Sequence, residues 1–281
     1  MEGLQGRMKE KKVAVIMSTY NGEKFIREQL DSILNQSYKN IDLIVRDDGS
    51  KDKTLSILRD FAKQDKRVRY ISFSRNFGHE AAVCAGLMHS TGDVVIVMDA
   101  DLQDPPEVIP ELIKKWEEGY QVVNARRASR KEDSFLKRKT AGMFYAWSDK
   151  ISHKIKVPQN VANFRLIDRR PLSEILEFGE KNRVFRIQVP YVGFKVCEVL
   201  FSRPKRVKGV SKYNPKSMFS LAISSTISLT VRPLEWSIGI CFVVAAICGL
   251  SWLSQAVFFI LDLTNGDNEI VILNLLSKFL N

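Results

Sequence analysis

The 281-residue sequence lacks the glycine-rich signatures of the two commonest phosphate-binding loops. No G-x-G-x-x-G follows the first predicted strand and no G-x-x-x-x-G-K-[ST] occurs, which argues against a dinucleotide-binding or P-loop protein. The four cysteines show no C-x-x-C spacing, so neither a zinc site nor a disulfide framework is indicated, and a reducing compartment fits. The amino-terminal stretch MEGLQGRMKEKK is charged and carries no long apolar run, so we expect no signal peptide.

Acidic residues are in the minority, and the formal net charge is +11. All but one of the 43 Lys and Arg precede residue 233, so this part of the chain should seek anionic surfaces. No basic stripe is interleaved with aromatic residues, which argues against nucleic acid as the partner. The adjoining hydrophobic tail favours lipid phosphate and a membrane instead.

The tail contains one long run without charge, Trp236 to Leu261. A helix of this length crosses a bilayer of about 30 Å. Basic residues precede the run and acidic residues follow it, so we expect the catalytic part to face the cytosol from the plasma membrane. We predict a cytosolic domain over 1–212, an amphipathic interface helix region over 213–234 and a transmembrane region over 235–281. The middle segment also suits a last core helix of the soluble domain.

Strand-like and helix-like patterns alternate four times in the first half of the chain. This alternation predicts an α/β fold with a mostly parallel sheet. The predicted strands begin at Val13, Ile41, Val68 and Val94. Polar residues follow each of them, and the carboxyl ends of parallel strands form the edge where α/β proteins bind ligands.

The fourth strand, VVIVM, runs into Asp99, Asp101 and Gln103. Asp99 and Asp101 are two residues apart, so an extended backbone points both carboxylates the same way, and unpaired carboxylates in contact repel. A hard divalent cation would relieve the repulsion, and oxygen-only ligands indicate Mg²⁺ or Mn²⁺. The alternative is an acidic turn that caps the helix started by Pro105 and Pro106.

Asp47 and Asp48 end the second strand in the motif DDGS. Carboxylates at this position suit hydrogen bonds from a nucleobase or from ribose hydroxyls. The alternative is a glycine-containing turn before a helix, and we expect Ser50 to serve as the helix cap in either case.

Taken together, these motifs resemble family 2 glycosyltransferases of GT-A fold, especially the polyprenyl-phosphate glycosyltransferases that include dolichyl-phosphate mannose synthase and the bactoprenol glucosyltransferases. The resemblance runs from Val13 to about Pro233 and rests on the order of STYNGEKF, VRDDGSKDKT, SRNFGHEAA, MDADLQDPPE, DSFLKR, NFRLIDRR, YVGFK, GVSKY and RPLEW. It implies an inverting transfer from a nucleotide-sugar, UDP-glucose first and UDP-N-acetylglucosamine or GDP-mannose next, to a polyprenyl phosphate such as undecaprenyl phosphate. It implies that the nucleotide-sugar contacts Thr19, Tyr20, Glu23, Asp47, Asp48 and Asp99, and that Asp99, Asp101 and Gln103 hold the metal.

A strongly basic segment, NARRASRKEDSFLKRK, suits an anionic acceptor because arginine grips phosphate with two hydrogen bonds. The resemblance singles out Arg127, Arg130 and Arg138 as acceptor-phosphate ligands. A solvated basic loop at the membrane surface is the simpler interpretation, and both can hold. The resemblance also implies that a closing segment with Arg206, Ser211 and Lys212 covers the diphosphate and that Arg165 lines the acceptor side. His79, after NFG, suits a position near the nucleotide, and the alternative is a purely structural histidine.

Two positions depart from the family pattern. Relatives often have Pro where Ser18 stands, and many have Asp where this chain has Asn163. The second departure keeps a rival hypothesis open, a catalytically silent nucleotide-sugar-binding scaffold subunit in the membrane. A processive polysaccharide synthase is disfavoured because one span builds no channel and no QxxRW stretch occurs. A homo-oligomer stays open.

Overall fold

The computed structural model describes residues 11–128, 161–179, 184–202 and 232–265, with residues 142, 223, 226, 230 and 277. The chain divides into two compact units, 1–229 and 230–281, and each is described by itself. The predicted domain boundaries, after residues 212 and 234, differ from the boundary between these two units and stay predictions.

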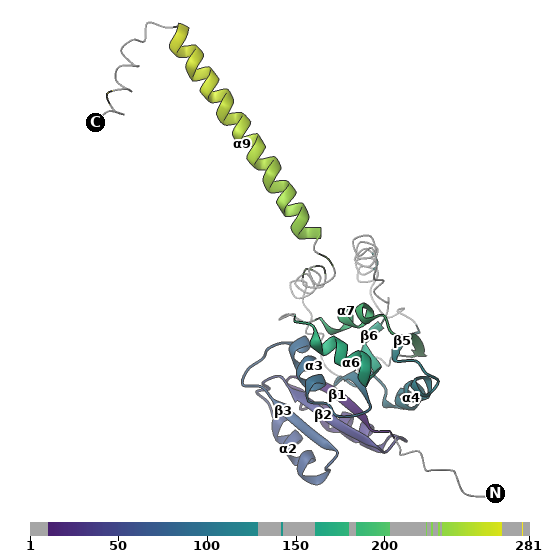
Figure 1. The fold of residues 1–281 in the computed structure, drawn as a ribbon. Helices are drawn as coiled ribbons and strands as arrows, with labels where there is room; N and C mark the ends of the chain where they lie inside the picture. Colours follow the sequence, from purple (N-terminus) through teal and green to yellow (C-terminus); the bar gives the residue numbers. More distant parts are fainter. Residues whose placement is uncertain are drawn as a thin grey trace, which may run out of the picture. The chain divides into compact units, whose positions relative to one another are not determined.

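The first unit is built on a seven-stranded sheet in the order β3-β2-β1-β4-β6-β5-β7, and Figure 1 labels β1, β2, β3, β5 and β6. Strand β6 runs antiparallel to both of its neighbours, and every other pairing is parallel. The strands are β1 (Val13–Thr19), β2 (Ile41–Asp47), β3 (Val68–Ser72), β4 (Val94–Asp99), β5 (Val122–Arg127), β6 (Val161–Asp168) and β7 (Val196–Phe201).

Helices cover both faces of this sheet, and two hydrophobic clusters show which helices cover which face. One cluster joins α1, α2 and α4 to the sheet, and the other joins α3, α6 and α7 to the opposite face. The helices of this unit are α1 (Ile26–Asn35), α2 (Thr54–Gln64), α3 (His79–Met88), α4 (Ile109–Glu117), α6 (Arg169–Glu177) and α7 (Phe185–Gln188), with 3-10 turns η1 (Pro106–Val108) and η2 (Val189–Val192).

The predicted alternation is confirmed, because each of the four predicted strands forms and a helix follows each one. Strands β1, β2 and β4 are buried on both faces, as continuous apolar runs require. Strand β6 lies between β4 and β5 in the sheet. Its position depends on pairing with strands that are distant in the sequence, so the local sequence pattern did not predict it. Because β6 is the one antiparallel strand of the seven, the sheet is mostly parallel, as predicted.

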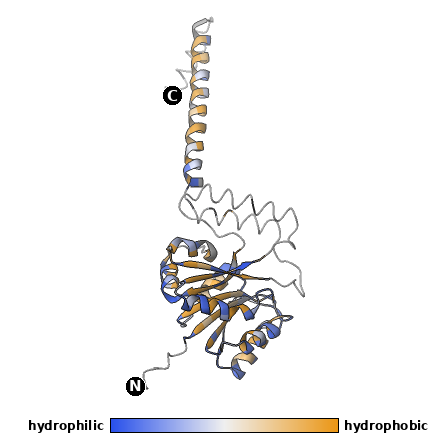
Figure 2. Ribbon diagram, turned by 90° about the vertical axis from the view of Figure 1, so that its right-hand side faces the viewer, coloured by the Kyte–Doolittle hydropathy of each residue, from blue (hydrophilic) through white to orange (hydrophobic). Residues whose placement is uncertain are grey.

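The second unit contains α9 (Arg232–Asn265), a single helix of 34 residues. Residues Leu234–Asp262 form a stretch of 29 residues, within which an 18-residue segment has a mean hydropathy of 2.0 and no buried residue. At 1.5 Å per residue this stretch is about 44 Å long, which exceeds the ~30 Å hydrocarbon core. Most of the α9 ribbon has the hydrophobic colour in Figure 2, and the helix is long and apolar enough to cross a membrane.

The predicted interface helix over 213–234 falls almost entirely outside the described residues. Ile223 and Thr226 are both helical there; Ile223 is exposed and Thr226 is buried.

Candidate active site at the carboxyl edge of the sheet

One edge of the sheet collects the residues that the sequence singled out. Strands β1, β2, β3 and β4 are mutually parallel, so they all end at this edge. Because β6 is antiparallel to both β4 and β5, strand β5 ends there too, and β6 begins there. Thr19, Asp47, Asp99 and Arg127 are the last residues of β1, β2, β4 and β5, which confirms the predicted gathering of strand ends.

The carboxylate of Asp47 is fully buried and holds the turn that follows β2. It accepts hydrogen bonds from the Ser50 N–H at 3.3 Å, from the Ser50 hydroxyl, and from the Ser72 hydroxyl at 3.4 Å. Ser50 in turn accepts from the Asn21 N–H at 2.8 Å. Asp47 therefore ties the loops after β1, β2 and β3 together.

Asp48 holds the loop after β3. Its two carboxylate oxygens accept hydrogen bonds from the N–H groups of Phe77 and Gly78 at 2.7 and 2.9 Å, and its own N–H donates to the Thr19 carbonyl at 2.9 Å. Gly78 precedes α3 with φ of 95°, a backbone conformation that favours glycine. Asp48 thus fixes the point at which α3 begins.

A buried arginine balances these two acids, and the sequence analysis missed it. Arg46 is fully buried on β2 and donates to the backbone carbonyls of Asp47 at 3.2 Å and Ile71 at 3.0 Å. Burial lowers the pKa of Arg46 to about 10, although Asp48 and Asp47 pull it upward. The guanidinium is still charged at neutral pH, so it compensates part of the negative charge of the acid pair. The signal was present, since a charged residue directly after the apolar run LIV calls for a partner.

The loops after β1 and β2 interlock through side chain to backbone hydrogen bonds. Glu23 accepts from the Lys53 N–H at 3.0 Å, and Asp52 accepts from the N–H groups of Glu23 at 3.2 Å and Thr54 at 3.0 Å. Glu23 is therefore engaged with the protein itself, and its role as a nucleotide contact stays a prediction. The expectation that Ser50 caps α2 is wrong, because Lys53 occupies the cap position without a side-chain hydrogen bond and Ser50 faces Asp47.

The acidic stretch after β4 is bent rather than extended. The strand ends at Asp99, and Leu102 has φ of 59° in the left-handed region. The assumption of an extended backbone through Asp101 is therefore wrong. Two buried side chains stabilise the bend: Asp104 accepts from the Asp99 N–H at 2.9 Å, and Gln29 on α1 accepts from the Leu102 N–H at 3.0 Å.

These contacts separate the acids by role. Asp104 is fully buried and belongs to the turn, whereas Asp99, Asp101 and Gln103 are partly exposed at the strand end. The three offer oxygen atoms only, which fits a hard divalent cation such as Mg²⁺ or Mn²⁺. Within the described ranges, no cluster of three or more His, Cys, Asp and Glu suits a metal, so the fit depends on the amide oxygen of Gln103.

The remaining predicted residues divide into two groups. Tyr20 directly follows β1 and is partly exposed. Arg127 is the last residue of β5, and its side chain lies on the opposite face of the strand from that of Arg126. Arg126 pairs with Glu198 at 2.8 Å. Arg165 is 2% exposed and packs against the Phe185 ring, so it is buried rather than lining an open surface. The structure does not describe five further predicted site residues, so their roles stay predictions: Arg130, Arg138, Arg206, Ser211 and Lys212.

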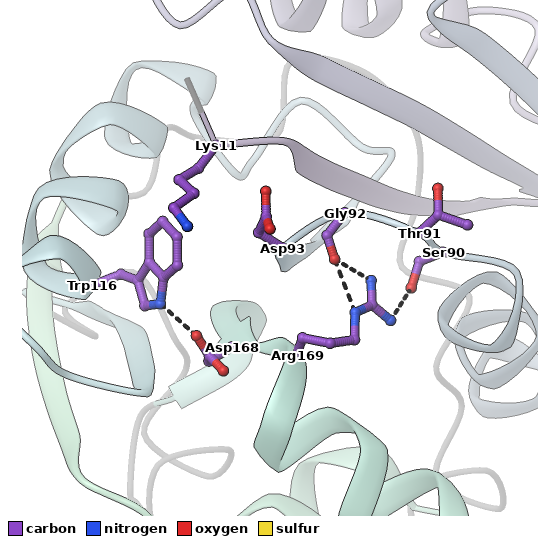
Figure 3. A pocket seen from close by; sticks show the side chains of 8 residues that line it. All are labelled: Lys11, Ser90, Thr91, Gly92, Asp93, Trp116, Asp168 and Arg169. Atoms are coloured by element: carbon purple, nitrogen blue, oxygen red, sulfur yellow. Dashed lines mark hydrogen bonds between the residues drawn. The ribbon is translucent and has the colours of Figure 1, made fainter. Parts of the chain in front are cut away.

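An open pocket of about 580 Å³ lies at the opposite, amino edge of the sheet (Figure 3). There the Trp116 indole donates to Asp168 at 2.7 Å, and Arg169 donates to the Gly92 carbonyl at 2.9 Å and to the Ser90 hydroxyl at 3.2 Å. These side chains bond to one another and fasten the loop before β4. The pocket is remote from the acidic edge, so we assign it a structural role.

Comparison with known proteins decides the family. Residues 14–176 match the glycosyl transferase family 2 profile, which is more than half of the chain. The chain belongs to glycosyl transferase family 2. It is 40% identical over 225 residues to the uncharacterized glycosyltransferase YkcC of Bacillus subtilis, covering 79% of this chain and 69% of that one. It is 39% identical over 227 residues to the bactoprenol glucosyl transferase of Shigella phage SfV, covering 80% and 74%.

A solved structure supports the fold of this glycosyltransferase. Glucosyl-3-phosphoglycerate synthase from Mycobacterium tuberculosis, solved with Mn²⁺, UDP and glucosyl-3-phosphoglycerate, superposes with a TM-score of 0.55 over 79% of each chain. The sequence identity is 19%, so the likeness concerns the fold alone. The predicted GT-A, Rossmann-like architecture is confirmed.

Proposed function

We propose that this glycosyltransferase transfers a hexose, glucose first, from a UDP-sugar to a polyprenyl phosphate at the cytosolic face of the membrane, with inversion at the anomeric carbon. The observation that carries the proposal is the carboxylate cluster at the ends of β2 and β4 in a chain about 39% identical to a bactoprenol glucosyl transferase. An apolar helix long enough to cross a bilayer suits a lipid acceptor.

The donor fits the acidic edge in two parts. Asp48 keeps unused acceptor capacity, since a carboxylate has about four lone-pair positions and two are used, and it suits a base N–H or ribose hydroxyls. Asp47 is fully buried and accepts from Ser50 and Ser72, so its assigned contact with the nucleotide would require this turn to move. Asp99, Asp101 and Gln103 would hold the divalent cation. When bound, the cation supplies positive charge for the diphosphate leaving group.

The acceptor needs little activation. A lipid phosphate is already ionised at pH 7, so its oxygen attacks the anomeric carbon without a general base. The new oxygen–carbon bond forms as the bond from that carbon to the diphosphate oxygen breaks, and the nucleoside diphosphate leaves with the electron pair. Arg127, at the end of β5 on the same sheet edge, suits the acceptor phosphate.

The side of the membrane follows from charge. Basic residues precede α9, and Asp262, Asp267 and Glu269 follow the uncharged run Trp236 to Leu261. By the positive-inside rule, this charge difference supports a cytosolic location for the first unit.

The direct test is transfer of labelled sugar by the full-length protein in detergent. UDP-glucose, UDP-N-acetylglucosamine and GDP-mannose are each supplied with undecaprenyl phosphate and either Mg²⁺ or Mn²⁺. We expect labelled lipid with UDP-glucose. Labelled lipid from a different donor would correct the sugar, whereas no labelled lipid from any donor with folded protein would favour the silent scaffold subunit.

Two substitutions test the assigned residues. Asp101→Ala should abolish transfer, and exposed Asp31→Ala on α1 is the charge-matched control that should leave it unchanged. Arg127→Ala should chiefly raise the KM for the lipid, with exposed Arg59→Ala on α2 as its control. Normal turnover in both Asp101→Ala and Arg127→Ala would refute these roles.

A further inference from the structure

Ser18, Asp99 and Asn163 lie side by side on the face of the sheet that α3 covers, on the neighbouring strands β1, β4 and β6. Ala14 and Ile16 of β1 and Val95 and Val97 of β4 belong to the hydrophobic cluster under α3. Because side chains alternate along a strand, the next residues facing α3 are Ser18 on β1 and Asp99 on β4.

Strand register completes the row. Ser18 is paired with Asp99, and Val97 is paired with Arg165 on antiparallel β6. Because the two strands are antiparallel, the residue two positions after Val97 lies beside the residue two positions before Arg165. Asn163 therefore lies beside Asp99. Asp99 is therefore flanked by Ser18 on one side and by Asn163 on the other.

A single imidazole bridges the two flanking residues. His79, the first residue of α3, has Nδ1 2.9 Å from the Ser18 hydroxyl and Nε2 2.7 Å from Asn163 Nδ2. Nε2 lies 3.9 Å from Asp99 Oδ1, which is too far for a hydrogen bond but leaves little room between them. The ring therefore spans from β1 to β6 over the side chain of Asp99.

We propose that His79 is a positioning residue that fixes the orientation of Asp99 for the divalent cation of the donor site. The inference rests on the proposed function, because that function assigns Asp99 to the metal. Two hydrogen bonds hold the ring on the α3 side of Asp99, 3.9 Å from Oδ1, so the ring limits how far the Asp99 carboxylate can turn toward α3. Asp104 meanwhile holds the Asp99 backbone N–H at 2.9 Å, so both ends of the residue are fixed.

The two departures from the family pattern meet in this bridge. Ser18 supplies a hydroxyl where Pro has no hydrogen-bonding side chain, and that hydroxyl anchors Nδ1. Asn163 is 9% exposed, and its Oδ1 has no hydrogen-bond partner among the described residues, so its amide is committed to the ring. An amide pairs with either imidazole tautomer, and it adds no third negative charge beside Asp99 and Asp101.

The test measures Mn²⁺ binding rather than turnover. Free Mn²⁺ is followed by electron paramagnetic resonance during titration of the full-length protein in detergent with saturating UDP. We expect His79→Ala to weaken Mn²⁺ binding 10- to 100-fold, the usual effect of removing a residue that orients a metal ligand. His79→Gln, whose amide can still bond to Asn163, should recover most of the loss. His89→Ala, at the other end of α3 and exposed, is the matched control and should bind as wild type.

Each outcome decides. Wild-type Mn²⁺ affinity in His79→Ala, or a loss in His79→Gln as large as in His79→Ala, would overturn the bridge alone. Wild-type protein that binds UDP but no Mn²⁺ would overturn the proposed metal site and the bridge with it. If His79→Ala has no melting transition, Ser18→Ala decides: weakened Mn²⁺ binding supports the bridge, and unchanged binding overturns it.

Discussion

Asp48 offers the sharpest test of how the donor edge is held, because its two hydrogen bonds are short and buried. The residue is 4% exposed, and its carboxylate accepts from Phe77 and Gly78 at 2.7 and 2.9 Å. Asp48→Asn keeps the size of the side chain but removes the charge and turns an NH2 group toward one of two N–H donors. A hydrogen bond to a charged group contributes about 1.5–3 kcal/mol, so the lower value for both predicts a loss of about 3 kcal/mol.

The assay is hydrogen–deuterium exchange of the full-length protein, read from peptides that cover residues 73–79. A loss of about 3 kcal/mol corresponds to exchange of the Phe77 and Gly78 amides roughly a hundredfold faster. Asp60→Asn on the exposed side of α2 makes the same change in charge and should leave these amides unaffected. Equal exchange in Asp48→Asn and wild type would mean that the carboxylate does not hold this loop.

Two further predictions concern the loops around the site. Burial raises the pKa of Asp52, but hydrogen bonds from the Thr54 hydroxyl and from neighbouring N–H groups outweigh it and leave the pKa below 3.8. The stabilisation is therefore complete above the unfolded pKa and lost as pH falls through the folded one, so Asp52→Asn should lower the Tm by a few degrees at pH 7 and by less at pH 3. A pH-independent difference in Tm would contradict this. Gly49→Ala should destabilise more than Gly119→Ala, because both have positive φ but only the Gly49 methyl would lie 2.6 Å from the Arg75 backbone. Equal decreases in Tm for the two variants would mean that backbone strain from the positive φ explains the whole effect and that the contact with Arg75 adds nothing.

The sequence determined what depends on short-range patterning. A uniform apolar run predicted the buried strand β4, strand-like patterns predicted β1 and β2, and an uncharged run of helical length predicted α9. Because strand ends follow from the same patterns, the sequence also predicts that Asp47 and Asp99 lie at one edge of the sheet. Parallel strands separated by helices leave little freedom in where their carboxyl ends lie.

Only the tertiary structure decided which of these residues touch. Ser18 and His79 are 61 residues apart, and His79 and Asn163 are 84 apart, so their meeting over Asp99 requires β6 to enter the sheet beside β4. The contact of Arg46 on β2 with the Ile71 carbonyl on β3, and that of Gln29 on α1 with the Leu102 N–H, are likewise set by packing between separate elements. Hydrophobic periodicity reports which face of a strand is buried, but strand order and hydrogen-bond partners depend on contacts across the whole sheet.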